Sequence, residues 1–174
     1  EYDWECPSDL KLSILIPTRD KLELLRRCLN SFEKFKPGVK IEVVIINNDS
    51  SNPETIKYLN DFKNNEEISY ERKIISISGK FNYSKLNNLG FLESTGDVIL
   101  LLNNDVEFIA PNWGHKLMSN ALRKDIGCVG AKLLYSDNTI QHAGIVLGIG
   151  GVAGHINKYM KNDMHIPHDI NFQR

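Results

Sequence analysis

Three polar residues in a row, residues 103–105 (Asn-Asn-Asp), directly follow residues 98–102, the most apolar run of the sequence. A carboxylate this close to a buried strand needs a partner, which can be a hydrogen-bond donor or a metal ion. A Mg²⁺ or Mn²⁺ ion that bridges a diphosphate takes only one or two carboxylates from the protein, because phosphates and waters complete its shell. Asp105 is therefore our candidate ligand for such an ion, with Glu107 as a candidate for indirect support. The alternative is an Asx turn in which Asp105 caps local structure.

Three further apolar runs, at residues 12–16, 41–46 and 68–77, also end in polar residues. If all four runs are parallel strands, their carboxyl ends lie at one edge of the sheet, where open α/β sheets bind their ligands. The alternative is ordinary loop chemistry, because exposed turns favour Asn, Asp and Gly in any α/β protein. The residues that follow the three runs are Pro17, Thr18, Arg19 and Asp20, then Asn47, Asn48, Asp49 and Ser50, then Gly79, Lys80, Phe81 and Asn82.

Helical patterns separate these runs. Apolar residues recur at spacings of three and four between residues 22 and 32, as an amphipathic helix requires. We expect further helices to begin near Pro53 and to cover residues 83–94 and 113–123. Strands that alternate with helices are typical of an α/β fold with a mostly parallel sheet. The run at residues 68–77 is less apolar than its neighbours and is predicted to lie nearer an edge of that sheet.

The pattern changes after residue 123. Strands are expected near residues 128–134 and 139–147, and the turn signal at residues 136–138 predicts that they form a hairpin. From Gly148 onward the sequence is rich in Gly, Asn and His, and we expect irregular structure there. The length of 174 residues fits a single domain with one core.

Composition and charge exclude several classes of protein. Hydrophobic residues make up 41% of the chain and charged residues 25%, which are ordinary values for a globular domain. With 21 Lys and Arg against 22 Asp and Glu, the net charge of −1 gives no broad field for a nucleic-acid partner, so a phosphate ligand must be held locally. The sequence has no transmembrane run of about 18 apolar residues and no signal peptide, which predicts a cytoplasmic location. Cys6, Cys28 and Cys128 are widely spaced and are predicted to be reduced thiols.

Four stretches of the chain resemble family 2 glycosyltransferases of the GT-A fold. They are SILIPTRD at residues 13–20, VVIINNDSS at 43–51, FNYSKLNNLG at 81–90 and GDVILLLNNDVE at 96–107. Later stretches, at residues 130–135, 141–144 and 150–155, are similar to a bacterial branch that includes rhamnosyltransferase-like enzymes of surface polysaccharide synthesis. The resemblance runs from about residue 12 to 156 and keeps the motifs in family order.

This resemblance implies a Rossmann-like GT-A nucleotide-diphospho-sugar transferase fold, with helices on both faces of the sheet and a truncated C-terminal side. It implies transfer of a sugar, with inversion, from a UDP- or dTDP-sugar donor to a saccharide or lipid-linked saccharide acceptor. Rhamnose carried on dTDP is the donor that the bacterial branch suggests. Asp105 takes the place of a ligand for Mn²⁺ or Mg²⁺. The residues that the resemblance assigns to donor binding are Pro17, Thr18, Arg19, Asn47, Asn48, Ser50, Lys80, Asn82, Asn88, Asn103 and Asn104.

The chain departs from the family pattern at three points. Asn47 stands where the family has a base-contacting Asp, and Asn103 replaces the first Asp of the Asp-x-Asp metal motif. The family's general base, which takes the proton of the acceptor hydroxyl, belongs to a later segment and is expected beyond residue 174. The sequence therefore predicts one domain, residues 1–174, that is a piece of a longer enzyme, held at the inner membrane face through other parts of it. The alternative function is a non-catalytic module that binds a nucleotide sugar or scaffolds a partner.

Two other patterns compete with this interpretation. Residues 148–153 fit the dinucleotide pattern Gly-x-Gly-x-x-Ala, but Gly154 follows at once where a long helix should begin, which favours a flexible glycine loop. The four histidines after residue 140 lack the spacing of a zinc site, and we interpret them as surface residues. They are His142, His155, His165 and His168.

Overall fold

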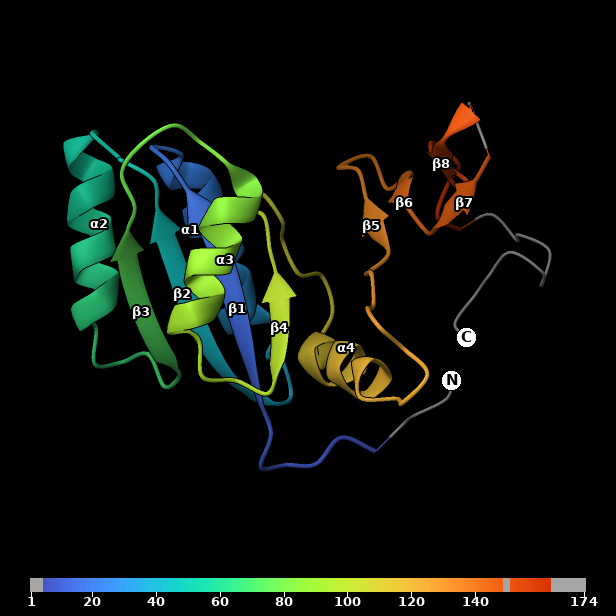
Figure 1. Cartoon of the computed structure of the whole chain (residues 1–174), viewed down its shortest axis with the longest axis horizontal. Coiled ribbons are helices and arrows are strands. Elements are labelled where there is room, and N and C mark those ends of the chain that lie inside the picture. The colour runs from blue at the N-terminus through green and yellow to red at the C-terminus, as the bar shows by residue number, and fades with distance from the viewer. Residues whose placement is uncertain (1–4, 149–150, 164–174) are drawn as a thin grey trace. The chain divides into compact units, whose positions relative to one another are not determined.

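Apolar and β-branched residues form a four-stranded parallel sheet in the computed structural model of this chain, which describes residues 5–148 and 151–163 (Figure 1). The strands are β1 (Lys11–Thr18), β2 (Lys40–Asn47), β3 (Glu71–Ser76) and β4 (Val98–Leu101), and their order is β3-β2-β1-β4. The two central strands are buried along almost their whole length, as the continuous apolar runs predict. The predicted parallel sheet is therefore confirmed, and so is the edge position of the third strand.

The first strand is longer than its sequence predicts. We expected it to stop before Pro17, but β1 continues through Pro17 to Thr18. β4 pairs with β1 only as far as Leu15, so Pro17 lies where β1 has a neighbour on one side, and a residue without an N–H is tolerated there.

Helices cover both faces of the sheet. α1 (Leu22–Lys34), α2 (Pro53–Asn64) and α4 (Trp113–Ala121) contribute to one apolar cluster, and α3 (Tyr83–Glu93) contributes to the other (Figure 1). The alternation of side chains along a strand separates the two clusters, because neighbouring residues such as Ile14 and Leu15 point to opposite faces. No helix of the described part of the chain is long and apolar enough to cross a membrane.

A missing side chain lets α3 approach the sheet closely. A Cβ atom at Gly90 would lie 2.5 Å from Ile46 Cδ1 and 3.5 Å from Leu15 Cδ1, and the first of these distances is shorter than any stable contact. Gly90 is therefore required by packing, and it sets the distance between α3 and the strands that precede the candidate site.

A buried carboxylate links the strands near their amino-terminal ends. Glu42 accepts hydrogen bonds from Ser13 Oγ (2.6 Å) and from the N–H of Thr95 (2.8 Å), and it lies 3.0 Å from Lys73 Nζ. Burial alone would raise the pKa of Glu42, but the bonds from Ser13, Thr95 and Lys73 outweigh it and lower the pKa to about 2. This network links β1, β2 and β3 with the segment before β4.

By their internal contacts, residues 5–119 form one compact unit, and the described residues from 120 onward belong to a second one. The second unit has two antiparallel pairs, β5 (Leu133–Leu134) with β6 (Ile140–His142), and β7 (Ile145–Leu147) with β8 (Ala153–His155). The prediction that residues 1–174 make one domain stays a prediction.

The second unit corrects two expectations. The predicted hairpin is present as β5 and β6, but it is shorter than expected, and the strand predicted over residues 139–147 divides into β6 and β7. The division falls at Gly144, which has φ +127°. The expectation of irregular structure after Gly148 is wrong for residues 153–155, because they form β8 and pair with β7. Gly148 (φ +92°) and Gly151 (φ +89°), which lie between the two strands, have the positive φ angles that turns use.

Candidate functional site

The strand order places a change of direction at the centre of the sheet. The chain builds outward from β1 through β2 to β3, then crosses to the other side of β1 to form β4. In open parallel sheets, ligands bind beyond the carboxyl ends of the two strands that flank such a switch point. Here those ends carry Thr18 and Asn104. The two side chains are joined directly, because Asn104 Nδ2 donates a hydrogen bond of 2.9 Å to Thr18 Oγ1.

A carboxylate that the sequence did not single out joins the loops after β1 and β2. Asp20 accepts hydrogen bonds from the N–H groups of Ser51 (2.9 Å) and Asn52 (2.8 Å), and its own N–H donates to Ser50 Oγ (3.1 Å). The N–H groups of Ser51 and Asn52, helped by the charge of Arg19, lower the pKa of Asp20. Asp20 has φ +48°, a conformation that Asp adopts more readily than most residues. The signal in the sequence was therefore only the residue type, an Asp directly after a strand.

Two residues of the β2 loop hold the loop after β3. Asn48 is 1% exposed, and its Nδ2 donates to the carbonyls of Ile77 and Gly79, each at 3.0 Å. Asp49 accepts from the N–H of Gly79 at 2.7 Å, and this bond, with a smaller effect from Arg19, lowers the pKa of Asp49. Asn48 Oδ1 is buried with no hydrogen-bond partner among the described residues. The loops after β1, β2 and β3 are therefore one connected surface, joined to β4 through Thr18.

Two of the predicted donor-binding residues have structural partners of their own. Asn47 Oδ1 accepts the N–H of Ser50 at 3.0 Å, which closes the turn after β2. Asn82 is the N-cap of α3, and its Oδ1 accepts the N–H of Lys85 at 2.9 Å. These bonds position the two loops, and they leave the amide NH₂ groups of both side chains for other partners.

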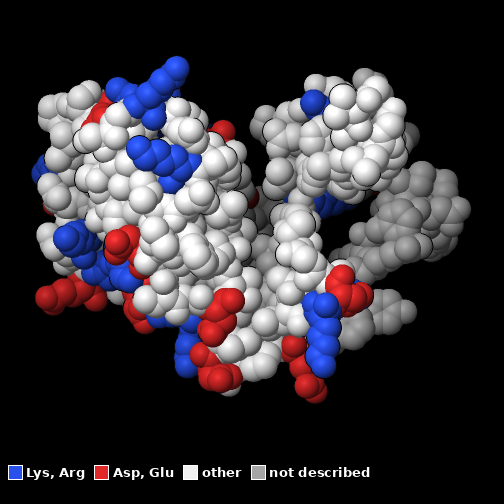
Figure 2. Space-filling view, in the orientation of Figure 1, with Lys and Arg blue, Asp and Glu red and all other residues white. Residues whose placement is uncertain are grey.

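Two other predicted residues belong to these loops, and a third lies further along α3. Arg19 and Lys80 are exposed in the loops after β1 and β3, and Asn88 is exposed on α3, away from that helix's buried side chains. Lys and Arg side chains lie over the end of the sheet where the strands finish, on the face shown in Figure 2. The carboxylates of Asp20 and Asp49, whose pKa values are lowered by backbone N–H groups, lie in the same loops and offset part of this positive charge.

The metal prediction finds limited support in the geometry. Asn103 and Asp105 are exposed, and Asn104 is occupied with Thr18. Glu107, our candidate for indirect support, forms an ion pair with Arg27 of α1. Within the described ranges, no group of three or more His, Cys, Asp or Glu could hold a metal ion. The residues present fit only an ion that takes one carboxylate from the protein and most of its ligands from phosphate and water.

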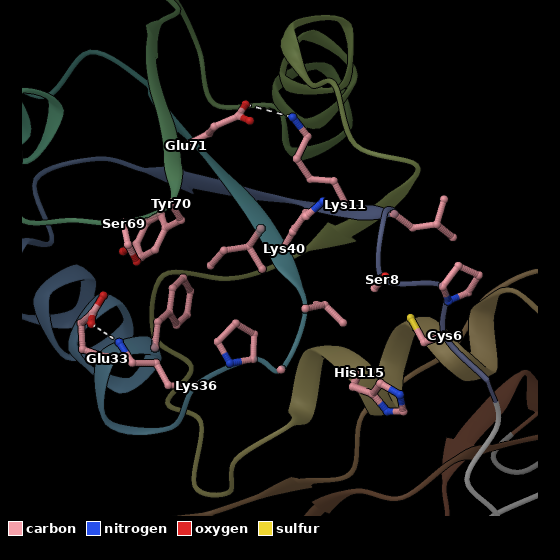
Figure 3. A pocket seen from close by; sticks show the side chains of 17 residues that line it. Cys6, Ser8, Lys11, Glu33, Lys36, Lys40, Ser69, Tyr70, Glu71 and His115 are labelled. Atoms are coloured by element: carbon pink, nitrogen blue, oxygen red, sulfur yellow. Dashed lines mark hydrogen bonds and ion pairs between the residues drawn. The ribbon is translucent and has the colours of Figure 1, made fainter.

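Two cavities of the first unit lie elsewhere. One, of about 630 Å³, opens at the amino-terminal edge of the sheet, beside Lys11, Lys40 and Tyr70 (Figure 3). The other, of about 610 Å³, is lined by residues of α1 and α2. Neither includes a predicted donor-binding residue. Because β1 spans about 23 Å, at about 3.3 Å per residue, the cavity in Figure 3 is on the opposite edge from the connected loops.

Comparison with known sequences finds relatives over most of the chain. A family model described as "Glycosyl transferase family 2" matches residues 13–166. The uncharacterized protein y4gI of Sinorhizobium fredii (strain NBRC 101917 / NGR234) is 38% identical over 152 residues, which cover 87% of this chain and 16% of that protein. The O-antigen biosynthesis protein RfbC of Myxococcus xanthus is 36% identical over 145 residues, which cover 83% of this chain and 11% of that protein. The chain thus spans less than a fifth of the length of these curated relatives.

Solved structures share the fold. The mannosyltransferase PcManGT from Pyrobaculum calidifontis, in complex with GDP-Man and Mn²⁺, has a TM-score of 0.61 at 15% identity, over 75% of this chain and 40% of that chain. The structure of S. aureus TarS 1-349 has a TM-score of 0.50 at 21% identity, over 64% of this chain and 31% of that chain. At these identities the likeness concerns the fold alone, and it confirms the predicted GT-A architecture.

Proposed function

The chain belongs to glycosyltransferase family 2, and from this premise we propose that its connected strand-end loops bind the nucleoside diphosphate of a sugar donor. The observation that carries the proposal is the Thr18–Asn104 hydrogen bond. It lies at the switch point between β1 and β4, where a parallel sheet offers its ligand site. PcManGT, which shares the fold, is described in complex with the nucleotide sugar GDP-Man.

Each loop offers groups suited to a different part of such a donor. Thr18 and Arg19 are proposed to line the nucleoside pocket with Pro17. Asn47 and Ser50 are proposed to meet the base or the ribose, because amides and hydroxyls can hydrogen-bond both, whereas the buried Asn48 is proposed to position the loop after β3. The segment after β3, with Lys80, Asn82 and Asn88, is proposed to lie near the diphosphate or the sugar, where the lysine offsets negative charge.

In this proposal a divalent cation would be held through a single carboxylate of this segment. Asp105 would hold Mn²⁺ or Mg²⁺ together with the diphosphate oxygens, with Asn103 and Asn104 beside it. The bound ion would neutralise charge on the leaving diphosphate. Asp105 is then the one carboxylate that this segment supplies, so we propose that the diphosphate provides more of the ion's ligands than the protein does.

We propose the chemical step for the longer protein. The donor is a UDP- or dTDP-sugar, with rhamnose suggested by the bacterial branch, and the acceptor is a saccharide or lipid-linked saccharide of surface polysaccharide synthesis. The name of RfbC, an O-antigen biosynthesis protein, supports this setting. Direct displacement at the anomeric carbon inverts its configuration, and a general base outside residues 1–174 takes the acceptor proton. The chain alone is proposed to bind donor and to turn over poorly. We propose a cytoplasmic location, at the inner membrane face through other parts of the longer protein.

A second candidate function is a non-catalytic module that binds a nucleotide sugar or scaffolds a partner. Two substitutions favour it: Asn47 and Asn103 stand where the family pattern has acids. The two functions differ in the longer protein, which transfers sugar if the first is correct and only binds it if the second is.

Calorimetric titration of the chain with UDP-, dTDP- and GDP-sugars, with and without Mn²⁺, tests the proposal. We expect one of these classes to bind. We expect Thr18→Val to weaken binding about fivefold, because it removes a hydrogen bond worth about 1 kcal/mol at the switch point. Lys40→Ala, in the cavity of Figure 3, is the control and should leave the affinity unchanged. Failure of all three classes to bind, or loss of binding only in Lys40→Ala, would overturn the proposal.

A further inference from the structure

Two histidines that the sequence places thirteen residues apart meet in the second unit. His142 is the last residue of β6 and His155 is the last residue of β8. Their Nδ1 atoms are 2.9 Å apart, and their ring planes are nearly perpendicular, at 83°. A hydrogen bond between them requires that one Nδ1 carries a proton and the other does not. When both rings carry their proton on Nε2, two nitrogen lone pairs are available in the same small space.

The spacing of the two nitrogens matches that of two ligands on one metal ion. With metal–nitrogen bonds of about 2.05 Å, two ligands of one ion lie about 2.9 Å apart at a right angle and about 3.3 Å apart at the tetrahedral angle. The observed 2.9 Å equals the first of these distances, and a shift of a few tenths of an ångström gives the second. The distance suits one ion bound to both rings, once rotation of the two side chains directs both lone pairs at it.

The backbone around the pair is fixed on both sides. His155 lies opposite Ile145 in the antiparallel β7–β8 ladder. Ile145 comes three residues after His142 along the chain. Between them, the carbonyl of Gly144 accepts the N–H of Ile156 at 3.1 Å, and Gly144 has the positive φ that lets the chain turn from β6 into β7. His142 is also paired through the β5–β6 ladder to Leu133. Ligands held on paired strands are placed before the ion arrives.

We propose that His142 and His155 form a binding site for a divalent transition-metal ion. Neutral imidazole nitrogen suits Zn²⁺, Ni²⁺, Cu²⁺ and Fe²⁺, whereas Mg²⁺ and Ca²⁺ take oxygen ligands. In the part of the chain that is described, these two nitrogens are the protein ligands, since no group of three metal-binding residues is found there. The remaining positions of the ion are therefore left to water or to an added ligand. This site is separate from the proposed role of Asp105 and does not depend on it.

Titration of the whole chain with Zn²⁺ and Ni²⁺, followed by calorimetry, tests the site. We expect one ion per chain and at least a tenfold loss of affinity in each of His142→Gln and His155→Gln, with no binding of Mg²⁺ at this site. His115→Gln, which removes a histidine from α4 in the other unit, is the matched control and should change the affinity less than twofold. Unchanged affinity in both of the first two variants would overturn the proposal, and so would the same loss in all three.

A measurement on the unaltered chain covers the case in which a variant does not fold. Paramagnetic Co²⁺, followed through the ¹⁵N signals of the histidine rings, should shift or broaden the signals of His142 and His155. Signals of His142 and His155 that stay unchanged at saturating Co²⁺ would show that the two rings only share a hydrogen bond.

Discussion

Residues 5–119 and the described residues from 120 onward use similar apolar side chains in opposite ways. In the first unit, Ile14 and Phe32 are 0% and 1% exposed within the apolar cluster on one face of the sheet. In the second, Leu147 at the end of the three-residue strand β7 is 83% exposed, and Val152, just before β8, is 82% exposed. The long strands of the first unit are therefore stabilised by the burial of their apolar side chains. The short strand pairs of the second unit bury less, and they position side chains such as His142 and His155.

The largest expected effect is a loss in the free energy of unfolding when a core side chain of the first unit is removed. Phe32→Ala removes a ring whose centroid lies 5.3 Å from that of Phe108 and 5.5 Å from that of Trp113, so it leaves a cavity in the core. We expect it to lower the free energy of unfolding by about 3–5 kcal/mol. Leu147→Ala is the control and should change it by less than about 0.5 kcal/mol. Urea unfolding followed by circular dichroism measures both, and equal losses would contradict the comparison.

The second effect concerns the polar network of the first unit and depends on pH. The pKa of Glu42 is held at about 2 in the folded chain, below its ordinary value of 4.5. A carboxyl group with a lowered pKa stabilises the folded state at pH values above the pKa that it has in the unfolded chain. This stabilisation is lost as the pH falls through the pKa that it has in the folded chain. Glu42→Gln should cost about 1.5–3 kcal/mol at pH 7, and the difference from wild type should shrink between pH 4.5 and pH 2.

Glu71→Gln is the matched control for that experiment. Glu71 forms an ion pair with Lys11 at 2.9 Å, but its side chain is 63% exposed. Water screens such a pair, so this variant should change the free energy of unfolding by less than about 1 kcal/mol at any pH. A pH profile for Glu42→Gln that runs parallel to that of the wild type would contradict the assigned network.

The third effect compares the two edges of the sheet. Asp20 binds N–H groups of the connected loops, and Asp97 makes a similar bond of 2.9 Å to the N–H of Lys11 at the opposite edge. Asp20→Asn should weaken binding of a nucleotide sugar about tenfold, because it loosens the loops after β1 and β2. Asp97→Asn should lower stability slightly and leave the affinity unchanged. The affinities of the two variants for a nucleotide sugar, measured by calorimetry, show at which end of the strands the donor binds. Equal affinities would place the binding site elsewhere.

The smallest effect is expected in the second unit. Val152→Ser replaces a side chain that is 82% exposed, so we expect the free energy of unfolding to change by less than about 0.5 kcal/mol. Thermal unfolding monitors this variant. A loss of more than about 2 kcal/mol would show that the β7–β8 pair is packed against other parts of the chain in solution.

The elements that sequence predicts best are those with a long repeated pattern. Residues 41–46 form a buried strand because they are a nearly continuous apolar run, and residues 22–34 form α1 because their apolar residues repeat with the helical period. β8 was missed, because three residues with two neighbouring glycines carry no measurable period. A strand this short is specified by its partner, β7, through contacts that a local pattern does not contain.

The candidate site divides in a similar way. Thr18, Asn48 and Asn104 were predicted from their positions after strands, and the structure joins each of them to a neighbouring strand or loop. Asp20 was missed as an organising residue, since its partners are about 30 residues away along the chain. The meeting of His142 and His155 depends on two successive turns, so spacing alone could not show it.

The central claim is that the loops at the carboxyl edge of the sheet, and not the cavity of Figure 3, receive a nucleoside diphosphate. Titration of the ¹⁵N-labelled chain with UDP, dTDP or GDP in the presence of Mg²⁺ tests it residue by residue. We predict that the amide signals of Thr18, Ser51 and Gly79 shift on binding while those of Lys11 and Lys40 stay in place. Shifts that concentrate at Lys11 and Lys40, or an unchanged spectrum with all three nucleotides, would contradict it.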